Sequence, residues 1–134
     1  MKLNRILGNL LFALYFFVNG IHGGAHLFHN VPLGPAQYGF ILIFFILFPI
    51  WALWKYHRGQ EKFAFLILLI SMIPASVFAF TYHFVLITPD NVCMFGNSLA
   101  DLWFVVSAYM VSIVNFILIV FSAYVFLKSD VKGN

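Results

Sequence analysis

Three histidines stand at helical spacing at the end of the first apolar segment of the chain. His22 and His26 are four residues apart, and His29 follows His26 by three. On a helix these intervals place the three imidazole rings on one face. Imidazole binds metal ions and exchanges protons near neutral pH, and ionisable groups inside a membrane segment are costly unless they have a use. The cluster therefore indicates a functional site.

A fourth histidine is expected at the same depth. His83 lies a few residues before the end of the third apolar segment, and His22 lies a few residues before the end of the first. At about 1.5 Å per residue these depths match if both ends lie on one side of a membrane. Asp90 and Asp101 follow on that side, in the next loop and at the start of the fourth segment. We therefore expect the ring nitrogens of His22 and His83 to lie within about 8 Å of each other, close enough for one ion to bridge them.

The first chemistry that fits these side chains is a divalent metal site. Two imidazoles four apart on one helix can share an ion, and a carboxylate or a third imidazole from another helix completes the site. The predicted metal ligands are His22, His26, His83 and Asp101, with His29 and Asp90 as secondary candidates.

Two other chemistries and one structural interpretation remain open. In the haem alternative, His22 or His26 would bind the iron opposite His83, and the glycines near them would leave room for the macrocycle. A proton or quinone site would use the same His and Asp side chains at the membrane edge. In the structural interpretation, histidines near lipid headgroups cost little and only hydrogen-bond across a bundle.

The composition places the chain among polytopic membrane proteins. Of its 134 residues, 63% are hydrophobic and only 8% are charged, and its mean hydropathy is +0.99. Soluble domains are nearer half apolar and about a quarter charged. The basic pI of about 9.2 does not indicate nucleic-acid binding, since the basic residues lie where membrane topology requires them. The lone Cys93 excludes an intramolecular disulfide.

Four apolar segments predict an all-α fold, a membrane four-helix bundle formed by one domain over residues 1–134. The expected spans cover about 6–27, 38–54, 63–87 and 101–127. A short connection from Asn30 to Gln37 and a polar loop from Lys55 to Lys62 separate the first three. Pro49 should kink the second span. A signal peptide cleaved after Ala25 is the alternative interpretation of the first segment.

The basic residues predict the orientation of the chain. All seven fall in the amino terminus, the loop between the second and third spans, or the carboxyl tail: Lys2, Arg5, Lys55, Arg58, Lys62, Lys128 and Lys132. By the positive-inside rule, both termini and that middle loop are cytoplasmic. The histidine cluster then lies at the outer face of what we expect to be the plasma (inner) membrane.

The sequence also limits the classes of function to two. No Ser or Cys is clearly set beside a base, and the histidines are too few for the boxes of a di-iron oxygenase, so an independent enzyme is not expected. One hypothesis is a stand-alone metal-binding or redox-linked protein. The other is a non-catalytic accessory or scaffold subunit whose Phe-rich faces contact membrane protein partners or a second copy of the chain.

The start of the chain resembles one known family. Arg5-Ile6-Leu7-Gly8, then Phe12, Gly20 and His22, is similar to the opening of the DoxX-like small four-helix membrane proteins. The resemblance covers about 20 residues, and the second segment lacks the Gly and Glu typical of that family. It implies a four-helix bundle, tied in some members to quinone-linked sulfur oxidation, and assigns no functional residue here.

Overall fold

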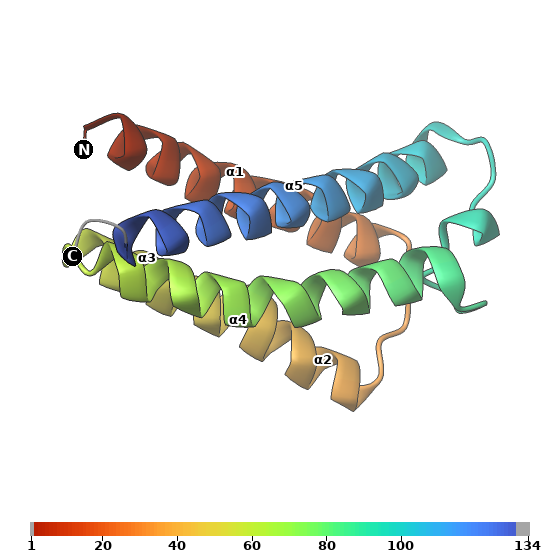
Figure 1. Cartoon of the computed structure of the whole chain (residues 1–134). Coiled ribbons are helices and arrows are strands. Elements are labelled where there is room, and N and C mark those ends of the chain that lie inside the picture. The colour runs from red at the N-terminus through yellow and green to blue at the C-terminus, as the bar shows by residue number, and fades with distance from the viewer. Residues whose placement is uncertain (1, 131–134) are drawn as a thin grey trace. The chain divides into compact units, whose positions relative to one another are not determined.

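The computed structural model describes the backbone of residues 2–130 and the side-chain surroundings of residues 5–128. Lys132 and the side chain of Lys2, both used to predict the orientation, lie outside those ranges. The described chain is all-α (Figure 1). Its elements are α1 (Lys2–Phe28), α2 (Pro35–Ile41), the π-helix η1 (Leu42–Leu47), α3 (Phe48–His57), α4 (Glu61–Phe80), the π-helix η2 (Thr81–Val85), the 3₁₀ turn η3 (Val92–Met94) and α5 (Leu99–Asp130).

Four helical stretches are long and apolar enough to cross a membrane, which confirms the predicted number of spans. They are Arg5–Phe28, Pro35–His57, Glu61–Val85 and Leu99–Lys128. Many of their large apolar side chains are exposed, among them Leu27, Phe116 and Leu127. A lipid environment covers such surfaces at no cost, whereas water does not. The chain is therefore a four-span, membrane-type helical protein.

The second span is longer than predicted at both ends. Pro35 opens α2 rather than breaking it, because proline fits the first helical turn, where its missing N–H is not needed. At the other end α3 continues to His57, and the turn that follows closes around Gly59, which has φ +78°. There the Gln60 N–H donates to the Lys55 carbonyl at 3.0 Å. This left-handed glycine cap shortens the expected polar loop 55–62 to the three residues between the helices.

A π-helical stretch precedes the proline in the second span. η1 ends immediately before α3, whose second residue is Pro49. Proline lacks an N–H and disturbs the helical ladder of the preceding turn, so a widened turn accommodates it. Ser71 of α4 donates a hydrogen bond to the Phe44 carbonyl within this stretch. The backbone irregularity predicted from Pro49 is thus a local widening, and the helix continues beyond it.

The described residues form two compact units. Within residues 2–130, unit 1 comprises the chain up to Pro32 together with Phe78–Val114, and unit 2 comprises Leu33–Val77 and the chain from Asn115 onward. Within unit 1, the end of α1 lies beside the start of α5 (Figure 1), with the Phe28 and Trp103 rings 5.6 Å apart. The core of unit 1 includes Phe12, Tyr15, Val18, Phe104 and Val111, and that of unit 2 includes Phe65, Leu68, Met72 and Leu118. All residues of the predicted site belong to unit 1.

Candidate metal centre

The end of α1 presents two histidines one turn apart. His22 and His26 lie in the last two turns, and the helix closes with Asn30 in the left-handed region at φ 50°. The Val31 N–H donates to the His26 carbonyl at 3.1 Å, the bond of a Schellman cap. Asparagine tolerates this conformation better than most residues with a Cβ. The cap fixes where α1 ends, so both rings are held on the face that the spacing predicts.

The third histidine is placed by a π-helical turn. His83 lies in η2, where the Leu86 N–H reaches back to the Thr81 carbonyl at 2.9 Å. Such a turn carries one more residue than an α-turn, which rotates the side chains that follow, and π-turns recur at functional sites. The chain then becomes extended at Leu86 and loops back to bring Asp90 beside His83.

The Nε2 atom of His22 lies close to those of two other histidines. It is 3.0 Å from that of His83 and 3.1 Å from that of His26. Taking one ligand atom from each ring, the three lie within 4.8 Å of one another. His22 is 8% exposed and His83 is 5% exposed. The expected approach of His22 and His83 is confirmed, and the buried group of His22, His26 and His83 could hold a metal ion.

The Ser107 hydroxyl holds the ring of His22. Its oxygen is 2.9 Å from His22 Nδ1 and 2.9 Å from the Phe104 carbonyl oxygen, and its single proton can be donated to either. When Ser107 donates to the carbonyl, it accepts the Nδ1 proton of His22. The Nε2 of His22 then carries a lone pair, which is the form that binds metals.

A backbone carbonyl fixes the tautomer of His83. Its Nδ1 is 2.9 Å from the Asp90 backbone carbonyl, which can only accept. A neutral His83 is therefore protonated on Nδ1 and presents a lone pair on Nε2. This lone pair faces the Nε2 of His22 at 3.0 Å, and it accepts a hydrogen bond when the His22 proton is on Nε2.

His26 is oriented by the Asp90 carboxylate. Its Nδ1 is 3.5 Å from Oδ1 of Asp90, and both atoms are buried without a hydrogen-bond partner within the described residues. With a proton on Nδ1 facing the carboxylate, the Nε2 of His26 also offers a lone pair. Burial raises the pKa of Asp90 from 3.8 to about 6, so the carboxyl is mostly ionised at neutral pH.

His29 and Asp101 lie together but outside the group of three. The Nε2–H of His29 donates to the Ala100 carbonyl at 2.9 Å, and its Nδ1 is 3.8 Å from Oδ1 of Asp101. Oδ2 of Asp101 accepts from the Ser98 hydroxyl at 2.6 Å and from the Ser98 N–H at 3.3 Å. Asp101, predicted as a ligand, thus caps the start of α5, and the secondary candidate Asp90 lies at the three histidines instead.

Sequence reasoning missed two residues of the site. Ser107 orients His22, and the Phe104 ring packs against the group with centroid distances of 5.2 Å to His22 and 5.0 Å to His26. Phe95 stacks on Phe104 at 4.0 Å. A serine or a phenylalanine in an apolar helix carries no signal of such a role. Only the alignment of α5 beside α1 reveals it.

A single ion fits this geometry better than haem. Three nitrogens bound to one tetrahedral ion at about 2.0–2.1 Å lie about 3.4 Å from one another, close to the 3.0 and 3.1 Å that separate Nε2 of His22 from those of His83 and His26. Haem iron bound by His22 and His83 from opposite faces would need nitrogens about 4 Å apart and an open slot between the rings. The two rings instead meet edge to face, with centroids 4.8 Å apart.

Comparison of the chain with protein-family models, curated proteins and solved structures finds no match. The site is therefore defined by its own geometry, and the resemblance of the first residues to DoxX-like proteins stays a prediction.

Proposed function

We propose that the chain is a membrane protein that binds one divalent transition-metal ion through Nε2 of His22, His26 and His83. The observation that carries this proposal is the approach of three imidazole rings, with Nε2 of His22 3.0 Å from Nε2 of His83 and 3.1 Å from Nε2 of His26. One ligand nitrogen from each ring lies within 4.8 Å of the other two. A metal ion between the rings would be bound by three nitrogen lone pairs.

The surroundings of the rings are those of a metal site. Histidine ligands usually donate their second N–H to a carbonyl, a hydroxyl or a carboxylate, which fixes the tautomer and the ring. Here the Nδ1 of His22 contacts the Ser107 hydroxyl, the Nδ1–H of His83 donates to the Asp90 carbonyl, and the Nδ1 of His26 faces the Asp90 carboxylate. A single residue, Asp90, thus orients two ligands and places a negative charge beside the ion.

The set of ligands narrows the choice of metal. Three neutral imidazoles suit Zn²⁺, Cu²⁺, Fe²⁺ or Ni²⁺ and suit Mg²⁺ or Ca²⁺ poorly, since these prefer oxygen. Three protein ligands leave a fourth position of a tetrahedral ion for water or an external molecule. The proposed function is the binding of a metal ion whose fourth ligand can exchange. A Cu or Fe ion at this site would also allow redox chemistry.

The proposed setting is a four-helix bundle with both termini in the cytoplasm. Its support is the confinement of all seven basic residues to the two ends of the chain and to residues 55–62, where α3 ends and α4 begins. In this orientation the three histidines lie near the outer face of the plasma membrane. The rival is an accessory subunit in which the histidines share a proton and bind no metal.

Equilibrium metal binding separates these two functions. The purified full chain in detergent is titrated with Zn²⁺ in competition with a chromophoric chelator. We expect one ion per chain and a loss of at least about 100-fold in affinity for His22→Gln, more than the loss typical of a residue that only orients a ligand. His57→Gln, at the end of α3, is the matched control and should bind as the wild type does. Equal, weak binding by all three proteins would favour the accessory subunit.

A further inference from the structure

The three-histidine centre is buried, so an ion needs a route to it. Resting on the proposed function, we infer that His29 and Asp101 form a second, partly exposed cation site that loads the buried centre. The Asp101 side chain is 23% exposed, whereas that of Asp90, next to the centre, is 4% exposed. The pair of His29 and Asp101 therefore lies at the boundary between solvent and the buried histidines.

The geometry of His29 and Asp101 suits a cation. The Nε2–H of His29 is committed to the Ala100 carbonyl, so a neutral His29 presents the lone pair of Nδ1 to Oδ1 of Asp101. The two atoms are 3.8 Å apart and both are acceptors. An ion with bonds of about 2.0–2.2 Å to nitrogen and oxygen can bridge such a gap.

A second pair of imidazole and carboxylate groups shares His26 with the centre. His26 Nδ1 and Asp90 Oδ1 are 3.5 Å apart, buried, and without a hydrogen-bond partner among the residues that the structure describes. His29 continues the helical hydrogen bonding of α1, since its N–H donates to the Ala25 carbonyl at 3.0 Å. His26 and His29 thus lie one turn apart on the same face.

Imidazole and carboxylate groups therefore succeed one another from solvent to the centre. His29 with Asp101 comes first, His26 with Asp90 second, and His22 with His83 last. Each of these pairs offers a carboxylate oxygen or an imidazole lone pair to an ion. Phe104 lies against His22 and His26 of α1 and against His29 just after it, with ring centroids 5.2, 5.0 and 5.9 Å apart, and forms one wall of this route.

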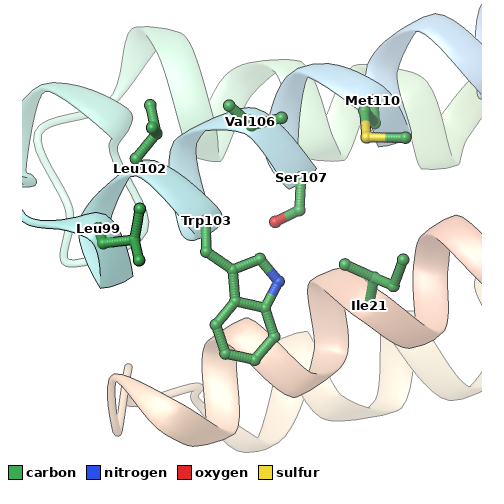
Figure 2. Close-up of a pocket in the computed structure, with 7 residues that line it drawn as sticks. All are labelled: Ile21, Leu99, Leu102, Trp103, Val106, Ser107 and Met110. Atoms are coloured by element: carbon green, nitrogen blue, oxygen red, sulfur yellow. The ribbon is translucent and has the colours of Figure 1, made fainter.

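The other opening near the centre is unsuited to ions. Behind Ser107 lies an open pocket of about 310 Å³ between α1 and α5 (Figure 2). Its lining is apolar apart from the Ser107 hydroxyl and the Trp103 indole: Ile21, Leu99, Leu102, Trp103, Val106, Ser107 and Met110. All seven residues belong to candidate membrane spans. A bare cation crossing such a surface would lose its hydration without gaining ligands.

The test is the rate of metal loading by the intact chain. Co²⁺ is mixed with metal-free protein, and its visible absorption is followed in a stopped-flow instrument. Release to excess chelator is measured separately, and the ratio of the two rates gives the affinity. The variants are His29→Gln, which can still donate to the Ala100 carbonyl, and Asp101→Asn, which can still accept from Ser98. His57→Gln is the control.

We expect both variants to load and release Co²⁺ about tenfold more slowly, with an unchanged equilibrium affinity. His29→Gln removes no carboxylate, so its slowing cannot come from long-range attraction alone. Unchanged rates would overturn the loading site and leave the three-histidine centre standing. A fall in affinity equal to the fall in loading rate would also overturn it, because a residue of the route changes both rates together. Failure of the wild type to bind Co²⁺ would instead refute the proposed function.

Discussion

The Nε2 atoms of His22 and His83 lie 3.0 Å apart, and the Nδ1–H of His83 donates to the Asp90 carbonyl. His83 therefore presents the lone pair of its Nε2 to His22. In the metal-free chain the Nε2–H of His22 can donate to that lone pair. With metal bound, these two nitrogens and the Nε2 of His26 would be the ligands of one ion.

The contact between Ser107 and His22 predicts a graded effect on metal binding. Ser107→Ala removes the acceptor for the Nδ1 proton of His22, which frees the ring to rotate and weakens its donor nitrogen. We expect the affinity for Zn²⁺ to fall about 10–100-fold. Ser112→Ala is the matched control, since Ser112 lies on the same helix and donates to the Ala108 carbonyl of that helix. Equal affinities for the two variants would show that Ser107 does not support the site.

The burial of Asp90 predicts a pH-dependent stability of the metal-free protein. Its pKa is about 6 in the folded chain and 3.8 when exposed, so the folded state keeps the proton longer. The contribution of Asp90 to stability is therefore full below about pH 4 and is lost as the pH rises through 6. Asp90→Asn does not titrate. Its stability relative to the wild type should rise by at most about 3 kcal/mol between pH 4 and pH 7.

This difference is measured by thermal unfolding in detergent with chelator present at each pH. Titration of the histidines affects both proteins and largely cancels in the comparison. A difference that stays flat, or that falls with rising pH, would contradict the raised pKa of Asp90.

The distribution of basic residues predicts the sidedness of the chain. Cys93 is exposed in the loop before α5 and should react with an impermeant maleimide added outside intact cells. A cysteine at Gln60, introduced with Cys93→Ser, should react only after the membrane is opened. Gln60 is preferable to Gly59, whose φ of +78° a side chain would strain. The reverse labelling pattern would place the three histidines on the cytoplasmic side.

The lengths of the apolar segments predicted much of the fold, and the spacing of the histidines predicted part of the site. The number of spans and the approach of His22 to His83 were predictable, because helical rise converts sequence position into depth. The ends of the second span were not, since Pro35 and Gly59 are helix breakers in one setting and helix caps in another.

The sequence did not predict that Asp90, rather than Asp101, lies at the three histidines. Asp101 has a serine three residues before it, and that local capping bond holds its carboxylate at the start of α5. Asp90 reaches the histidines because η2 and the extended Leu86 fold the loop back over them. Spacing alone predicts neither a π-turn nor the path of a loop.

X-ray absorption fine structure of the zinc-loaded chain tests the central claim most directly. The protein is loaded with one equivalent of Zn²⁺ in detergent, freed of loosely bound metal, and compared with His83→Gln prepared in the same way. The proposed centre predicts three imidazole nitrogens at about 2.0–2.1 Å in the wild type, with their multiple-scattering signature, and loss of the bound zinc or of one imidazole in the variant. A wild-type spectrum without imidazole scattering, or one that His83→Gln leaves unchanged, would contradict a metal centre formed by His22, His26 and His83.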